Sequence, residues 1–348
     1  MPELRFDYAT ADWVVFAPLR KLRPQSSSEQ AGGERGASLP RDPSCPFCPG
    51  NEAMTPHEID SVSASSSSSV PWRVRVVPNK FPALQIEENH ERVDLGTVFH
   101  KMGGCGAHEV VIESPEHGTF LAAQPLEQVE AVIKMLHRRY IDLMRDSRFR
   151  SVIVFKNHGD RAGTSLRHPH WQIIATPVVP RMLRLQHVEA EQFFDRTGRS
   201  LYETILREEQ SDGQRVIAAN DEFVAFLPFA GHLPFETWIM PTRSQSSFGL
   251  MQHEQVRPLA KLLQFVLMKL YVSLEDPHFN LTVDTASRGD EDHPGFRWHI
   301  RILPRLSTQA GFELGSGMSI NTVLPEDAAS FLRGGNGIVR VPPGVPEG

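Results

Sequence analysis

The feature that most constrains the fold of this 348-residue chain is a weak internal repeat. The tripeptide EQV at 127–129 recurs at 254–256, and the segment HPHWQIIATP at 168–177 has a degenerate counterpart, RWHIRILP, at 297–304. Two segments that recur in the same order and at nearly the same offset indicate two similar halves. We therefore expect an internal duplication.

Each half shows the same plan of strands and one long helix. Apolar residues step by three and four over 125–146 and again over 252–275, as they do on one face of a helix. Runs rich in Val and Ile predict strands at 12–17, 73–78, 108–113, 151–156 and 170–176. This plan favours an α+β fold of two halves, 1–190 and 191–348, with a mainly antiparallel sheet and helices packed on it.

The two copies differ where chemistry would be carried out. The first copy offers His168, His170 and Gln172, whereas the second offers Arg297, His299 and Arg301. An arginine side chain stays protonated, so it serves neither as a nucleophile nor as a zinc ligand. Only the first copy is therefore a candidate catalytic centre.

In a strand, residues two apart point to the same face, so His168, His170 and Gln172 would line one side and Trp171 the other. The simpler alternative is the polar face of a half-exposed strand. The preceding segment 156–167 (KNHGDRAGTSLR) favours a functional site, because its glycines and hydroxyls are suited to bind an anion. Its Lys156, Arg161 and Arg167 would add positive charge. On its own, that segment would read as a solvated loop.

A C-x-x-C pair, Cys45 and Cys48, is the strongest metal signal. Zinc takes four N or S ligands in a tetrahedron, so two more must come from elsewhere. The best candidates are His168 and His117, with His57 and His108 as substitutes. A redox pair or two buried small residues are the alternatives. A site filled by four protein ligands would be structural.

Charge and hydropathy exclude several classes of protein. No apolar run approaches the roughly 18 residues of a membrane span, and the N-terminus lacks a signal-peptide pattern, so we expect a cytoplasmic protein without membrane contact. A net charge of −6 argues against a general nucleic-acid binder. The Gly-, Ser- and Pro-rich segments 25–43 and 63–69 are expected to be flexible surface loops.

The chain resembles galactose-1-phosphate uridylyltransferases and their relatives in the histidine-triad superfamily. HPHWQ, preceded by KNHGDRAGTS, is similar to the active-site segment of that family, and CPFCPGNE at 45–52 to its zinc thiols. Further similar segments occur in the family's order: DYATADWVVFAPLRKLRP (7–24), VVPNKFPAL (76–84), ESPEHG (113–118), PFETWIMP (234–241) and GFELGSGMSIN (311–321).

The resemblance implies a ping-pong transfer of a nucleoside monophosphate. His170 would attack the α-phosphorus of a nucleotide sugar, Gln172 would stabilise the developing charge, and a second phosphate nucleophile would collect the nucleotidyl group. The implied zinc ligands are Cys45, Cys48, His117 and His168, which selects His117 over its substitutes. The implied nucleotide and phosphate contacts are Arg20, Arg23, Asn79, Phe81, Asn157, Gly163 and Ser165. Glu313 would approach the sugar, and the resemblance implies a homodimer.

Three departures leave the substrate open. Phe312 stands where some members have a tyrosine, Lys80 replaces an acidic ribose contact, and Trp171 stands where a small residue is usual. Separately, the arginines around His299 lead us to expect no second metal. The first hypothesis is UMP transfer from UDP-glucose to galactose 1-phosphate. The second is transfer of AMP to inorganic phosphate, as in ADP-glucose phosphorylases, and the third is a non-catalytic, zinc-stabilised nucleotide-binding module.

Overall fold

One sheet of eleven strands runs through both halves of the described chain. The computed structural model describes residues 1–22, 41–64, 68–335 and 339–340. In sheet order the strands are β3 (Asp60–Ser63), β4 (Trp72–Pro78), β7 (Ala107–Ile112), β9 (His170–Thr176), β8 (Ser151–His158), β13 (Phe279–Asp284), β14 (His299–Pro304), β12 (Thr237–Pro241), β11 (Phe223–Phe226), β10 (Val216–Ala219) and β16 (Val339–Arg340).

The strand order reflects the repeat. The series β4-β7-β9-β8 in the first half is mirrored by β11-β12-β14-β13 in the second, and the two series meet where β8 pairs with β13. All these pairings are antiparallel. The predicted α+β fold with a mainly antiparallel sheet is confirmed, whereas the division at residue 190 stays a prediction.

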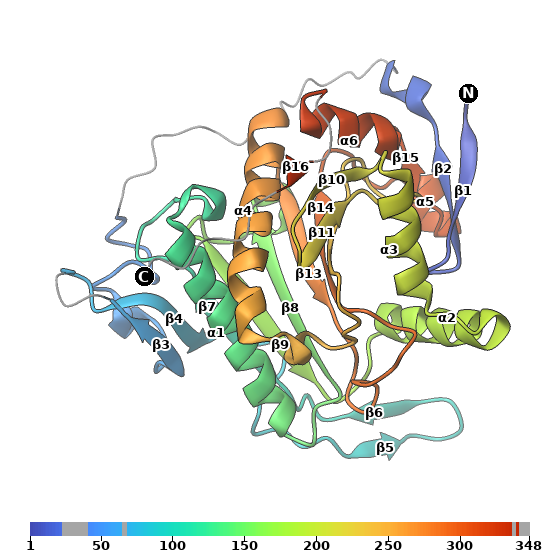
Figure 1. The fold of residues 1–348 in the computed structure, drawn as a ribbon. Coiled ribbons are helices and arrows are strands. Elements are labelled where there is room, and N and C mark those ends of the chain that lie inside the picture. Colours follow the sequence, from blue (N-terminus) through green and yellow to red (C-terminus); the bar gives the residue numbers. More distant parts are fainter. Residues whose placement is uncertain (23–40, 65–67, 336–338, 341–348) are drawn as a thin grey trace.

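Two long helices, α1 (Leu126–Arg145) and α4 (Val256–Ser273), lie side by side on one face of the sheet (Figure 1). Their apolar stripes pack on alternate residues of the strands, which include Trp171, Ile173 and Ile300. Trp171 is 1 % exposed, so it belongs to this core. The opposite face of β9 is thereby left to His170 and Gln172, because side chains alternate across a strand.

The opposite face of the second half is covered by α2 (Arg181–Thr197) and α3 (Leu201–Asp212), which the sequence interpretation did not identify. Tyr202 and Leu206 of α3 pack there with Trp238 and Met240 of β12. In α2, Gln186 and Ala190 are buried, and Leu183 and Phe193 are partly buried against the same cluster.

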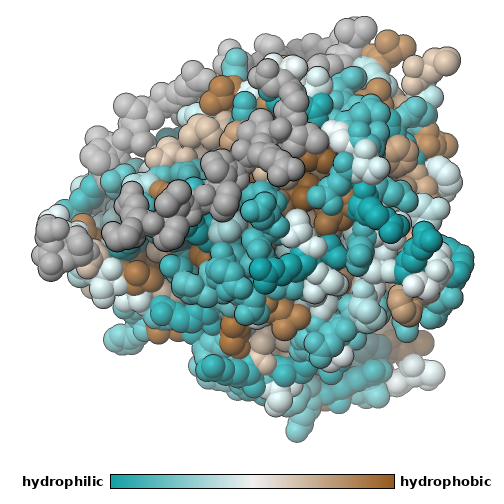
Figure 2. All heavy atoms as spheres, viewed as in Figure 1, coloured by the Kyte–Doolittle hydropathy of each residue, from teal (hydrophilic) through white to brown (hydrophobic). Residues whose placement is uncertain are grey.

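The remaining elements lie at the edges. An N-terminal hairpin, β1 (Glu3–Asp7) and β2 (Asp12–Phe16), pairs with β15 (Ile320–Asn321), and a separate ribbon contains β5 (Arg92–Asp94) and β6 (His100–Met102). Short helices α5 (Gly311–Ser316) and α6 (Pro325–Arg333) follow β14. The face seen in Figure 2 is largely hydrophilic, with small scattered apolar patches. None of the described helices is long and apolar enough to cross a membrane. Most of 25–43 and part of 63–69, the expected flexible loops, lie outside the described residues.

Candidate functional site

Four side chains from three separate segments form a compact cluster that could hold a metal ion. One ligand atom each from Cys45, Cys48, His117 and His168 lies within 4.8 Å of all the others. Cys48 Sγ is 3.4 Å from His117 Nδ1 and 3.6 Å from His168 Nδ1, and Cys45 Sγ is 3.7 Å from His168 Nδ1. The expected four-residue set is brought together. Of the two substitutes, His57 is exposed and His108 contacts Gln172 instead.

The chemistry of this cluster fits a bound cation. His168 Nε2 lies 2.8 Å from the main-chain oxygen of Ser114, which fixes Nε2 as the protonated nitrogen and leaves the lone pair of Nδ1 facing the sulfurs. Burial lowers the pKa of His168 to about 4, so its imidazole is neutral. Burial also raises the pKa of Cys45 to about 11, so its thiolate form requires a positive ion beside it.

His170 begins β9 two residues after His168. Its Nδ1 lies 2.8 Å from the main-chain oxygen of His168, and because that oxygen only accepts, Nδ1 carries the proton. The other ring nitrogen, Nε2, therefore keeps its lone pair. Burial lowers the pKa of His170, which favours the neutral imidazole. The residue has the protonation state that a nitrogen nucleophile requires.

Gln172 lies on the same face of β9 as His170. It pairs in register with Val110 of β7, so its side chain reaches diagonally to His108. Gln172 Oε1 is 2.8 Å from His108 Nε2. This contact was missed in the sequence, because it depends on the register between β7 and β9, for which no sequence signal exists.

A cavity of about 460 Å³ lies between the segment 78–87 and the C-terminal part of α1, and Asn79 and His108 are among the residues that line it. Asn79 Oδ1 accepts a hydrogen bond of 2.9 Å from the main-chain N–H of Phe81. The ring of Phe81 is 84 % exposed. The roles of Asn79 and Phe81 as nucleotide contacts stay predictions, and Phe81 presents an uncovered aromatic surface.

The glycine-rich loop after β8 brings Asn157 and Gly163 together. Gly163 has a φ of 85° in the left-handed region, and a Cβ built there would lie 3.9 Å from Asn157 Nδ2. Ser165 is exposed two residues further along. One expectation is wrong, because Lys156 does not add charge to this loop. Its side chain points to the helix-covered face, where the residue is 2 % exposed and its Nζ lies 2.9 Å from Glu113 Oε2.

Arg20 and Glu313, from opposite ends of the chain, line one cavity of about 590 Å³. The described residues that line it include none from β9. Glu313 Oε2 accepts a hydrogen bond from the main-chain N–H of Ala310 at the start of α5. Arg23, the second expected arginine, lies outside the described residues.

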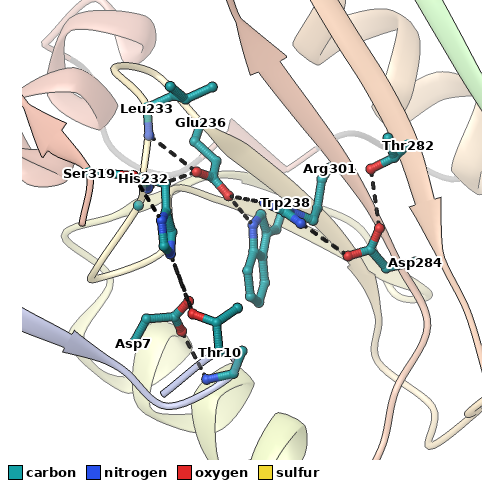
Figure 3. A network of polar contacts seen from close by, with 12 residues as sticks. Asp7, Thr10, His232, Leu233, Glu236, Trp238, Thr282, Asp284, Arg301 and Ser319 are labelled. Carbon is teal, nitrogen blue, oxygen red and sulfur yellow. Dashed lines mark hydrogen bonds and ion pairs between the residues drawn. The ribbon is translucent and has the colours of Figure 1, made fainter. Parts of the chain in front are cut away.

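The second copy keeps the ring geometry of the first, but its histidine is fully buried. His299 Nδ1 lies 3.0 Å from the main-chain oxygen of Arg297. In the first copy, His170 Nδ1 lies 2.8 Å from the main-chain oxygen of His168. The ring of His299 stacks on Trp238 at a centroid distance of 4.4 Å. In place of Gln172, Arg301 lies 3.3 Å from both Glu236 and Asp284 (Figure 3).

Comparison with known proteins identifies related chains. Residues 1–180 match the family model described as galactose-1-phosphate uridyl transferase, N-terminal domain, and residues 115–332 match a domain of unknown function, DUF4921. An ADP-glucose phosphorylase from Arabidopsis thaliana is 33 % identical over 95 % of this chain and 92 % of its own length. A galactose-1-phosphate uridylyltransferase from Thermotoga maritima is 27 % identical over 96 % of this chain and 98 % of its own.

Solved structures have the same fold. The crystal structure of the ADP-glucose phosphorylase from Arabidopsis thaliana with bound ADP-glucose has a TM-score of 0.81 at 31 % identity, and covers 96 % of this chain and 99 % of that one. A uridylyltransferase structure has a TM-score of 0.73 at 23 % identity, with 96 % and 98 % covered, which is a likeness of fold alone.

Proposed function

The chain belongs to the galactose-1-phosphate uridylyltransferase family of nucleotidyltransferases, and on that premise we propose that His170 carries a nucleoside monophosphate between a nucleotide sugar and a phosphate acceptor. The observation that carries the proposal is the 2.8 Å contact of His170 Nδ1 with the main-chain oxygen of His168. Because this contact holds the proton on Nδ1, the lone pair of Nε2 is available to phosphorus.

The reaction balances in two steps. The lone pair of His170 Nε2 forms a bond to the α-phosphorus, and the bond from that phosphorus to the bridging oxygen breaks, so hexose 1-phosphate leaves with the electron pair. The leaving phosphate has a second pKa of about 6 and needs no proton donor near neutral pH. An oxygen of the acceptor phosphate then attacks phosphorus, and the electrons of the P–N bond return to His170.

Gln172 suits transfer better than hydrolysis. Its amide donates a hydrogen bond but has no proton to give up, so it stabilises a phosphoryl oxygen without protonating a poor leaving group. A histidine at this position, as in hydrolytic members of the superfamily, would supply that proton.

The metal of this proposal is zinc. Zn–S bonds of about 2.3 Å and Zn–N bonds of about 2.0–2.1 Å in a tetrahedron place S and N ligands roughly 3.5 Å apart, and the three measured S–N distances are 3.4, 3.6 and 3.7 Å. Four protein ligands leave no open position, so zinc would be structural. It would hold Cys45, Cys48, His117 and His168, and through the main chain of His168 it would orient His170.

The other residues have binding roles in this proposal. Asn79 and Phe81 would contact the base and ribose, whereas Asn157, Gly163, Ser165, Arg20 and Arg23 would contact phosphate. Glu313 would contact the sugar, and two chains would pair as a homodimer. The catalytic half would span 1–190 and the degenerate half 191–348.

Two donors are the candidates. The first is UDP-glucose, with transfer of UMP to galactose 1-phosphate. It is supported by the relative named galactose-1-phosphate uridylyltransferase, which matches over 98 % of its own length. The second is ADP-glucose, with transfer of AMP to inorganic phosphate. The relative named ADP-glucose phosphorylase favours it, because its identity of 33 % exceeds the 27 % of the uridylyltransferase.

The test is a paired assay of the purified protein. UDP-glucose is given with galactose 1-phosphate, and ADP-glucose with inorganic phosphate, and both products are measured. We expect turnover of one pair, loss of that turnover in His170→Ala, and full turnover in the exposed control His57→Ala. Turnover of either pair by His170→Ala at the wild-type rate would contradict the proposal, as would turnover of neither pair by the wild type.

A further inference from the structure

The ring of His108 is held in one orientation by the main chain around it. The main-chain N–H of Ala83 lies 3.2 Å from His108 Nδ1 and donates to it. A main-chain N–H has no acceptor role, so His108 Nδ1 must be the unprotonated nitrogen. In the neutral ring the proton is then on Nε2.

That assignment decides how the side chain of Gln172 is turned. His108 Nε2–H points at the partner 2.8 Å away, and only an acceptor satisfies it, so the Gln172 atom there is the carbonyl oxygen Oε1. The amide –NH₂ of Gln172 is therefore the end that faces away from His108.

A third group touches the same nitrogen but makes no hydrogen bond with it in this tautomer. Asn79 Nδ2 lies 3.2 Å from His108 Nε2. Asn79 Oδ1 is engaged by the main-chain N–H of Phe81, so the amide group is the end next to the ring. Two donors do not bond each other, and the Ala83 N–H excludes the tautomer in which His108 Nε2 would accept from Asn79. The Asn79 –NH₂ therefore stays available to a ligand in the cavity that it lines with His108.

We propose that His108 is a positioning residue for the transfer step: it holds the Gln172 carbonyl so that the Gln172 amide N–H meets the phosphoryl oxygen. This inference rests on the proposed function. Without His108 the amide of Gln172 is free to rotate about its terminal torsion, and half of its orientations present an oxygen to the negatively charged phosphoryl group. Preorganised donors contribute to catalysis because they need no reorientation during the reaction.

The experiment is a double-mutant cycle with His108→Ala and Gln172→Ala, run with UDP-glucose plus galactose 1-phosphate and with ADP-glucose plus phosphate. We expect His108→Ala to lower kcat between about 10- and 100-fold, the scale of a misplaced catalytic group, with KM changed less than kcat. In the Gln172→Ala background the same change should cost less than about 2-fold, because no amide remains to be oriented.

A conservative variant separates positioning from packing. His108→Gln places an amide N–H close to the position of Nε2–H, so it should restore most of the kcat lost in His108→Ala, whereas thermal melting confirms that all variants fold. Independent, multiplicative losses in the cycle would overturn the inference, and so would a loss confined to KM. Failure of the proposed function has a different signature, which is undiminished turnover in His170→Ala.

Discussion

His170 Nδ1 lies 2.8 Å from the main-chain oxygen of His168, so a residue of the candidate metal cluster also orients the neighbouring imidazole. The relation couples the two parts of the site. Whatever fixes the segment at His168 also fixes which nitrogen of His170 keeps its lone pair.

Loss of a thiol ligand should remove the metal and the activity together. Cys48→Ser leaves three ligands, so we expect bound zinc to fall well below one equivalent per chain, with a lower melting temperature. Elemental analysis measures the bound zinc, and thermal unfolding measures the melting temperature. Cys105→Ala is the matched control, because Cys105 is buried outside the cluster, and it should retain its zinc. Full zinc in Cys48→Ser would rule out the four-ligand site.

Gln172→His should shift the balance from transfer to hydrolysis. An imidazole at this position can protonate a leaving group, which an amide cannot do. We expect the ratio of free nucleoside monophosphate to transfer product to rise above the wild-type ratio, as measured by chromatography of the products. Gln172→Ala removes the donor without adding an acid, so it should lower kcat by about 10²- to 10³-fold with no rise in that ratio. An equal rise in both variants would contradict the account.

We expect the buried second copy of the motif to contribute to the stability of the fold. Arg301→Met would leave the carboxylates of Glu236 and Asp284 without the guanidinium that lies between them (Figure 3). Removing one member of a buried ion pair costs about 3–5 kcal/mol, so chemical denaturation should show a loss of that order. Arg92→Met breaks an exposed pair with Asp94 and should leave stability nearly unchanged. Equal effects of the two substitutions would refute the assignment.

The hairpin contact between His232 and Asp7 should make stability depend on pH. Burial alone would lower the pKa of His232, but the hydrogen bond to Asp7 and the charge of Glu236 leave that pKa raised. A raised pKa means that the contribution is fully present below the unfolded value of about 6.5 and is lost as pH rises through the folded value. The stability difference between wild type and His232→Gln should therefore shrink from pH 6 to pH 8. A difference that grows over this range would contradict the prediction.

Local patterns in the sequence were enough for the fold class and for the thiol pair of the candidate metal cluster. The apolar stripe of 125–146 corresponds to α1 at Leu126–Arg145, and the predicted strand 170–176 coincides with β9. These features depend on periodicity within one segment. The ligand His117 could be chosen only by resemblance, since its place beside Cys48 depends on three segments meeting in space.

Contacts between strands could not be predicted from the sequence. Lys156 is next to the glycine-rich loop in the chain, yet strand alternation carries it to the core face, where Glu113 pairs with it. His108 meets Gln172 only because β7 and β9 pair with Val110 opposite Gln172. Neither fact follows from residue types, because a one-residue change of register would send each side chain to the other face.

In the proposed reaction, His170 bears the nucleotidyl group between the two half-reactions. To test this, the protein is mixed with UDP-glucose or ADP-glucose labelled at the α-phosphorus, with no acceptor present, and the reaction is quenched. The position of the label is then mapped by mass spectrometry. We expect one nucleoside monophosphate on the peptide that contains His170. This label should be stable in alkali, released by acid, and absent in His170→Ala. Turnover of a nucleotide sugar by a wild-type protein that never carries label at His170 would contradict the proposal.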